Sequence, residues 1–303
     1  MSTEDLRRRA RDFNLAFSRP PSVSTPEEVG EFYDKNNRVI TEIYGGNMHY
    51  GYWTGPDDDS GFSAAGARLT DIMIGKLAVE PGWRVLDLGC GTGGPGIRLA
   101  KATGAHVVGI SISTADVEQA NSRARDEGVA DRAEFRHANA IDLPFDAESF
   151  DAVLALESIV HIPDRRHVLG QIARVLRPGG RLALTDFVSF EPEKGTAEDK
   201  LAVTEMLAAW RAAPLVRAGD YHHFAAATGL VVDEIVDITE NTKYTFAKTY
   251  AALRAYARRH GELPPDMAHI FAMGAEVDWA AEDDTPPGEG VVIVVAHRPG
   301  ARA

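Results

Sequence analysis

The segment Val85–Gly94, with the sequence VLDLGCGTGG, constrains the fold of this chain more than any other. An apolar run that carries Asp87 leads into four glycines within six residues, and a helix is predicted directly after them, at 95–101. A glycine turn of this kind lets a nucleotide-like ligand approach the peptide N–H groups at a helix N-terminus, with the aspartate as an anion beside it. The spacing satisfies both GxGxG and GxGxxG, so the turn predicts a nucleotide site without identifying the nucleotide.

Strand-like and helix-like segments alternate along the chain from residue 62 onward. Strands are predicted at 84–88, 106–110, 133–137, 150–156, 181–187, 230–238 and 291–297, and further helices at 64–77, 113–127, 167–176 and 244–259. Buried strands that alternate with helices are typical of a parallel sheet covered on both faces. We therefore predict an α/β fold with a doubly wound, mostly parallel, seven-stranded Rossmann-like sheet.

A helix and an aromatic loop precede this alternation. The capping-box sequence from Thr25 to Glu28 predicts a helix start, and Gly45-Gly46 predicts its end. The loop Asn47–Trp53 then combines aromatic and polar side chains. It is either a core plug or a pocket cover, and the cover is preferred because a loop that buries several rings usually closes over something.

The ends of the chain suggest how it divides into domains. Residues 4–17 carry a narrow apolar stripe, which either packs on its own core or docks as an arm on a neighbouring subunit. Residues 1–59 are therefore predicted to be a helical arm and cover, with a homo-oligomer formed through the arm as one outcome. Residues 60–303 are predicted to form the Rossmann-like domain, with an inserted helical lid at 190–229.

The composition excludes several classes of protein. The net charge of −13 argues against a nucleic-acid partner, because phosphate binding needs a concentrated basic surface. The single cysteine, Cys90, excludes a disulfide framework and a cysteine-based zinc site. The apolar runs are far shorter than the ~20 residues that cross a bilayer, so we expect no membrane partner and a cytoplasmic location.

The end of the second predicted strand separates two classes of nucleotide. A dinucleotide-binding fold places an acidic residue there, about 20 residues after the glycines, to hold a ribose. Residues 108–113 instead read VGISIS, without an acid and without an arginine for a 2′-phosphate. Nicotinamide cofactors are therefore disfavoured.

Five segments together resemble one enzyme family, the class I S-adenosylmethionine-dependent methyltransferases. The similar segments are VLDLGCGTGGPGIRLA, GISIS, HANAIDLPF, FDAVLALESIVHIPD and VLRPGGRLALTDF. The resemblance runs from residue 47 to 187 and is strongest to small-molecule enzymes that tailor bacterial natural products and sugars. It implies S-adenosyl-L-methionine as cofactor, S-adenosyl-L-homocysteine as product and a small-molecule acceptor.

The resemblance also implies which residues bind the cofactor. The methionine moiety would be lined by the glycine turn and the cover loop, namely Asp87 near its amino group, Gly89, Gly91 and Gly93, with His49 near its carboxylate. Ribose and adenine would be held by residues at the ends of three strands and at one helix start, namely Ser111, Ile112, Asp116, Asn139, Ala140, Ile141 and Leu156. Relatives often carry glutamine at the position of Asp116 and aspartate at that of Asn139. Both side chains keep an oxygen acceptor, so we expect binding to survive.

His161 and Asp186 are the candidate catalytic residues. A sulfonium methyl group is already activated, so no metal is expected, and the protein has to align the nucleophile and exclude water. His161 follows the fourth predicted strand and titrates near neutrality, which suits a general base for a hydroxyl nucleophile. Asp186 ends the fifth strand and would orient the histidine or accept the proton, as in sugar-modifying relatives, although some of these carry a second histidine where Val160 stands. The neighbouring cluster 165–167 is interpreted as a solvated helix start.

Three functions remain open at this point. The preferred one is methylation of a hydroxyl oxygen on a bulky, largely apolar small molecule such as a bacterial secondary metabolite, because aromatic residues are frequent at 44–53 and 206–250. The alternative is methylation of an alkene, isoprenoid or aromatic carbon, with or without cyclisation. The third is a binding or cyclising protein that has kept the fold but transfers no methyl group.

Overall fold

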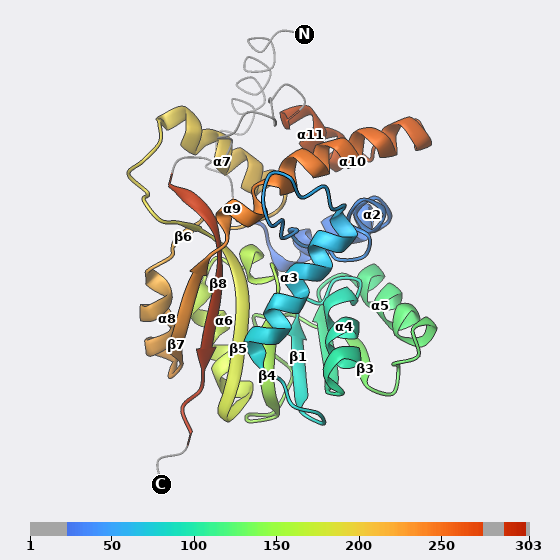
Figure 1. Ribbon diagram of the computed structural model, residues 1–303. Coiled ribbons are helices and arrows are strands. Elements are labelled where there is room, and N and C mark those ends of the chain that lie inside the picture. Colours follow the sequence, from blue (N-terminus) through green and yellow to red (C-terminus); the bar gives the residue numbers. More distant parts are fainter. Residues whose placement is uncertain (1–22, 275–287, 301–303) are drawn as a thin grey trace.

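The computed structural model describes residues 23–274 and 288–300 of the 303-residue chain. Its centre is one sheet in the order β3-β2-β1-β4-β5-β8-β7, with a short β6 paired to β5 (Figure 1). The strands are β1 (Arg84–Leu88), β2 (His106–Ser111), β3 (Ala133–His137), β4 (Phe150–Ala155), β5 (Leu176–Ser189), β6 (Val216–Arg217), β7 (Val231–Asp237) and β8 (Glu289–His297). Among the strands of the described residues, β8 alone runs against the direction of the others and pairs antiparallel with β5 and β7. The predicted doubly wound, mostly parallel sheet is confirmed, with β6 as an unpredicted addition.

Helices cover both faces of this sheet. One face is packed by α3 (Phe62–Leu77), α4 (Gly94–Thr103) and α5 (Thr114–Asp126), and the other by α6 (Arg165–Val175) and α8 (Asp220–Thr228). Each face has its own apolar core: Leu69 and Ile97 belong to the first, and Leu169 and Tyr221 to the second. Because β1, β2, β4 and β5 are parallel, their carboxyl ends meet at one edge of the sheet.

A third group of helices lies over the end of the sheet (Figure 1). It consists of α2 (Pro26–Tyr44), α7 (Ala197–Ala209), α9 (Thr239–Thr242), α10 (Tyr244–His260) and α11 (Pro265–Gly274). Phe32 and Trp53 lie in its core with Leu253 and Ile270. Of these helices, α9 and α11 were not predicted.

Local sequence sets the ends of α2 as predicted. Thr25 Oγ1 accepts the N–H of Glu28, and the Glu28 carboxylate accepts the N–H of Thr25, which completes the capping box. The helix ends at Gly45, which adopts the left-handed conformation with φ of 64°.

The division of the chain at residue 59 stays a prediction, and the arm at 4–17 lies outside the described residues. No helix in the described part is long and apolar enough to cross a membrane.

Candidate functional site

The glycine turn joins β1 to α4 and forms one side of the site. Gly89 and Gly93 have φ values of 76° and 81°, the left-handed region that favours glycine. A Cβ atom on Gly89 would lie 2.1 Å from the Cβ of Ser158, and one on Gly93 would lie 2.8 Å from the Cβ of Ala120. The turn therefore requires glycine for its backbone shape and for close packing, and it presents bare backbone at the N-terminus of α4.

Asp87 lies beneath this turn. Its carboxyl group is 1% exposed and accepts the backbone N–H of Gly96, while Oδ2 has no hydrogen-bond partner among the described residues. Burial raises the pKa of Asp87 to about 7. No described arginine, lysine or histidine pairs with it, so a cationic ligand group at this turn would stabilise its ionised form.

The ends of β2 and β3 bring together the residues predicted to hold ribose and adenine. The N–H of Ala138 donates to the carbonyl of Ser111 at 3.0 Å, which places the loop 139–141 beside Ile112. In that loop, Asn139 Oδ1 accepts the N–H of Ile141 at 3.0 Å, so this oxygen already has a partner within its own turn. These loop residues are partly exposed, as expected for a ligand edge.

Helix α2 covers this part of the site, which was not predicted. Asn37 Nδ2 donates to Oδ1 of Asp116 at 2.6 Å, and Asp34 Oδ1 accepts Ser113 Oγ at 2.6 Å. A Cβ atom on Gly30 would lie 2.8 Å from the carbonyl oxygen of Ile112, so the helix packs directly on the end of β2. Burial raises the pKa of Asp116 to about 6. The polar run Asp34–Asn37 within an otherwise amphipathic helix was the signal that could have predicted this contact.

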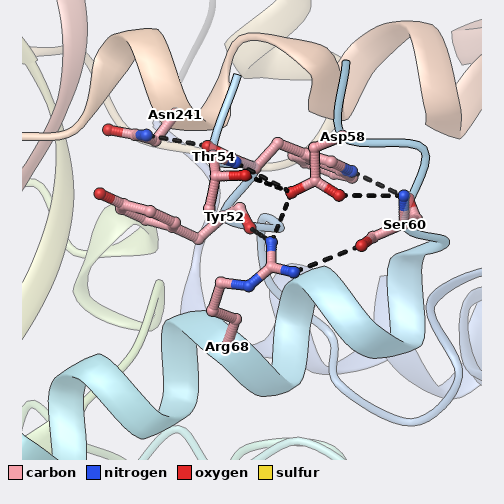
Figure 2. Close-up of polar contacts among 7 residues, drawn as sticks. Tyr52, Thr54, Asp58, Ser60, Arg68 and Asn241 are labelled. Carbon is pink, nitrogen blue, oxygen red and sulfur yellow. Dashed lines mark hydrogen bonds and ion pairs between the residues drawn. The ribbon is translucent and has the colours of Figure 1, made fainter. Parts of the chain in front are cut away.

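The loop Asn47–Trp53 is anchored in the core at its Trp53 end, and its role as a pocket cover stays a prediction. Trp53 is fully buried in the core, and its backbone N–H donates to the carbonyl of Asn241 at 2.8 Å. Figure 2 shows the loop anchored from α3, where Arg68 Nη1 donates to the carbonyl of Tyr52 and to the Asp58 carboxylate, both at 2.7 Å. The loop is therefore held by α3 and α9, through contacts that lie outside the glycine turn.

His49 lies inside this loop and is buried. Its Nδ1 is 2.8 Å from the carbonyl of Tyr50, and its Nε2 is 3.1 Å from Thr70 Oγ1. Burial lowers the pKa of His49 to about 4, so the ring is neutral at pH 7. Both ring nitrogens have partners within the protein, and the approach of His49 to a cofactor carboxylate stays a prediction.

His161 ends a short 3₁₀ helix, η1 (Ile159–His161), that follows β4. Its Nδ1 is 2.9 Å from the carbonyl oxygen of Arg211, which can only accept, so Nδ1 carries a proton. Its Nε2 is 3.0 Å from the hydroxyl of Tyr33 on α2. Burial lowers the pKa of His161, Arg165 adds to the decrease, and the Arg211 carbonyl and Asp186 oppose it. In the neutral ring, Nε2 is therefore an acceptor that faces a hydroxyl group.

Asp186 is not hydrogen-bonded to His161. Its Oδ2 accepts Arg165 Nε at 2.7 Å and the Tyr221 hydroxyl at 2.6 Å, and its Oδ1 accepts Arg165 Nη2 at 3.0 Å. The interpretation of residue 165 as part of a solvated helix start was wrong, because Arg165 is 2% exposed. Arg165 also donates to the carbonyl of Ile162, the residue after His161, so the ion pair supports η1 from below.

Glu157 is a further acidic group that was not predicted for the site. It follows Leu156, which is buried at the end of β4, and its φ of 50° is left-handed. Oε1 accepts the N–H of Tyr50 at 2.8 Å, and the Glu157 N–H donates to Thr185 Oγ1 at 2.8 Å. Burial raises the pKa of Glu157 to about 8. An acid immediately after a predicted strand was the available sequence signal.

This arrangement agrees with comparisons to known proteins. A family model described as a methyltransferase domain matches residues 79–239. The chain is 41% identical to the 27-O-demethylrifamycin SV methyltransferase of Amycolatopsis mediterranei, over 91% of this chain and 98% of the relative.

Two solved structures are similar over most of their length. The [4+2]-cyclase SpnF superposes with a TM-score of 0.77 at 27% identity, over 92% of this chain and 98% of that one. Geranyl diphosphate C-methyltransferase from Streptomyces coelicolor, solved with Mg²⁺, geranyl diphosphate and S-adenosyl-L-homocysteine, superposes with a TM-score of 0.69 at 20% identity, over 92% and 99%. The second likeness shows a shared fold alone.

Proposed function

This chain belongs to the S-adenosylmethionine-dependent methyltransferases, and from that premise we propose that it methylates a hydroxyl oxygen of a bulky, largely apolar small molecule. The observation that carries this proposal is the hydrogen-bonded position of His161. Its Nδ1 proton is held by the Arg211 carbonyl, and its Nε2 lies 3.0 Å from a hydroxyl group, that of Tyr33. A nitrogen that accepts from one hydroxyl is suited to take the proton of another.

The cofactor residues fit a sulfonium nucleoside. The glycine turn at 89–93 offers bare backbone, and the buried carboxyl of Asp87, whose Oδ2 has no partner among the described residues, fits the cationic amino group of a methionine moiety. Asp116 offers carboxylate oxygens for ribose hydroxyls, and Ile112 and Ile141 offer apolar surface for the adenine ring. When bound, S-adenosyl-L-methionine supplies an electrophilic methyl group and is released as S-adenosyl-L-homocysteine.

The role of His161 is to take one proton. As the acceptor oxygen gains its bond to the methyl carbon, its O–H bond breaks and the proton moves to Nε2 of His161. The carbonyl of Arg211 stabilises the imidazolium that results, because it accepts from Nδ1 in both protonation states. For the acceptor to reach Nε2, the Tyr33 hydroxyl has to give up this position or pass the proton on.

Aromatic rings support an apolar acceptor. Tyr50 packs against Phe187 with ring centroids 5.0 Å apart and against Phe246 at 5.6 Å, next to the Glu157 side of the site. Rings of this kind bind apolar surface, at about 25 cal/mol per Å² buried. The Amycolatopsis relative is named for a rifamycin acceptor, which supports a role in bacterial secondary metabolism, including antibiotic biosynthesis.

The experiment is methyl transfer from methyl-labelled cofactor to a panel of hydroxyl-bearing apolar macrocycles that includes 27-O-demethylrifamycin SV. We expect labelled product in which NMR shows the new methyl carbon bonded to oxygen. A methyl bonded to carbon would contradict the proposal and favour the alternative below. No transfer to any acceptor, with cofactor still bound, would favour a binding or cyclising protein.

Carbon methylation is a second candidate because of Glu157. A carboxyl group at the end of β4, beside the Tyr50–Phe187 ring pair, is suited to accept a proton from a carbon centre while the rings stabilise positive charge. In that case Glu157→Gln would abolish turnover and His161→Gln would leave it within about threefold, because general-base catalysis contributes about 10²–10⁴-fold only at the residue that takes the proton. Oxygen methylation predicts the opposite ranking.

We further propose that residues 4–17 complete the site or join a second subunit, and that the protein is cytoplasmic. Deletion of residues 1–19 is expected to leave cofactor affinity unchanged. It should weaken acceptor binding or lower the number of subunits per particle, as measured by light scattering. A truncated protein that matches the full chain in both properties would show that the arm has neither role.

A further inference from the structure

The turn after α7 is joined to η1 by two hydrogen bonds. The carbonyl oxygen of Arg211 accepts from Nδ1 of His161 at 2.9 Å. Two residues later, the N–H of Ala213 donates to the carbonyl of Val160 at 2.8 Å. The ring of His161 and the backbone that carries it are therefore both held by the same turn.

Arg211 has an unusual backbone conformation for a side-chain-bearing residue. Its φ is 60°, and among the described non-glycine residues only Ala78, Glu148 and Glu157 share a positive φ. The left-handed region is unfavourable for L-residues and persists where the surroundings fix it, often at functional sites. Here the strained residue is the one whose carbonyl contacts the histidine.

The backbone of the turn holds this conformation: the N–H of Arg211 donates to the carbonyl of Ala208 at 3.0 Å, and the N–H of Ala212 to that of Leu207 at 2.8 Å. The side chain of Arg211 contacts the helices over the sheet. Its guanidinium lies over the ring of Phe32, 5.6 Å from the centroid, and Nη2 is 3.4 Å from Asp266 Oδ1. Asp266 Oδ2 in turn accepts Asn36 Nδ2 at 3.2 Å. Helix α2, through Phe32 and Asn36, and helix α11, through Asp266, therefore pack beside the turn, while the backbone bonds fix its shape.

We propose that Arg211 is a positioning residue, whose left-handed backbone presents the carbonyl that keeps the Nδ1 proton on His161 and leaves Nε2 as the acceptor. This inference rests on the proposed function, in which Nε2 takes the proton of the acceptor hydroxyl. It extends that function by assigning the tautomer of the base to the backbone of this turn and not to the Arg211 side chain.

The test is a series at this position, Arg211→Asn, Arg211→Ala and Arg211→Val, in which the cost of the left-handed conformation rises. Nitrogen-15 NMR of the histidine ring, recorded without acceptor, is expected to show a single Nδ1–H tautomer in wild type and Arg211→Asn and a mixture in Arg211→Val. We expect kcat within about threefold of wild type for Asn and at least about tenfold lower for Val, with cofactor KM unchanged, because a general base contributes about 10²–10⁴-fold only in the correct tautomer.

Ala78→Val is the matched control. Ala78 follows α3 with a φ of 47°, so the substitution imposes similar backbone strain away from His161 and should leave tautomer and kcat unchanged. If Arg211→Val does not fold by circular dichroism, Arg211→Ala takes its place in the comparison.

Two results would overturn the proposal. One is an unchanged tautomer and kcat in the folded variant with the highest left-handed cost. The other is a loss in Arg211→Asn as large as in Arg211→Val, which would assign the effect to the side chain instead of the carbonyl. The NMR result holds whether or not His161→Gln lowers turnover, so failure of the positioning role and failure of the proposed base are separate outcomes.

Discussion

Where the methionine moiety of the cofactor is predicted to bind, the residues from Asp87 to Gly93 follow one another from the end of β1 into the glycine turn. On the acceptor side, His161 is held by Tyr33 and Arg211, which lie 128 and 50 residues away in the chain. The first arrangement depends on local backbone conformation and the second on the packing of distant helices. The comparison suggests that changes on one side should affect cofactor affinity and changes on the other should affect turnover.

The largest expected effect is on turnover. His161→Gln removes the proposed base, so we expect kcat to fall by about 10²–10⁴-fold while the dissociation constant of S-adenosyl-L-homocysteine, measured by calorimetry, changes less than about twofold. The control is His260→Gln, an exposed histidine near Glu42 that should leave both quantities unchanged. If His161→Gln lowered cofactor affinity as much as kcat, the claim that His161 acts on turnover alone would be wrong.

The next effect is on stability. Arg165→Met leaves the fully buried Asp186 carboxylate without its cationic partner, which costs about 3–5 kcal/mol of unfolding free energy. Arg98→Met breaks an ion pair with Asp71 in which the two side chains are 44% and 51% exposed, and such pairs contribute about 0–1 kcal/mol. Urea denaturation measures both. A similar loss for the two variants would show that the buried ion pair beneath η1 contributes no more to the unfolding free energy than an exposed pair.

A third test targets the glycine turn. Gly91 has a φ of 48°, so Gly91→Val should strain the turn and lower S-adenosyl-L-homocysteine affinity by at least about 100-fold, or about 2.8 kcal/mol. Gly128→Val places the same residue at a φ of 70° with no atom within 4 Å, so it should cost stability and leave affinity unchanged. If both variants bind like wild type, the turn is not the cofactor cradle.

The smallest effect concerns pH. Burial raises the pKa of Asp87 to about 7 and that of Glu157 to about 8, so the folded protein retains protons that the unfolded chain has released. The unfolding free energy therefore falls as the pH rises, until the pH exceeds the folded-state pKa of each group. The pKa values of His49 and His161 are lowered, so these two groups have the opposite effect on the unfolding free energy, but only below about pH 6.5.

The expected result is a loss on the order of 1 kcal/mol between pH 6.5 and 8 in the unliganded protein, measured by urea denaturation. Glu157→Gln should reduce the loss over the whole range, because the pKa of Glu157 lies near its upper end. Asp87→Asn should reduce the loss mainly at its lower end, around pH 7 and below. A stability that rises over this range would contradict the assigned directions.

The two sides also differ in how far the sequence predicts them. The β1 strand, the glycine turn and the capping box of α2 follow from short patterns, because the residues that form them are neighbours in the chain. The predicted histidine base is at the end of β4 as expected, but its partners are not the predicted Asp186. Tyr33 and Arg211 are far from His161 in the chain, and no local sequence pattern predicts that they pack against it. Arg165 has the local sequence of an ordinary charged helix start, and its burial follows from its pairing with Asp186, which also accepts the Tyr221 hydroxyl of α8.

The most direct test of the account is a crystal structure with S-adenosyl-L-homocysteine. The account predicts the methionine moiety on the turn at 89–93, the adenine between Ile112 and Ile141, and the sulfur facing Nε2 of His161. A ligand bound away from the glycine turn, or a sulfur atom that faces away from His161, would contradict the account.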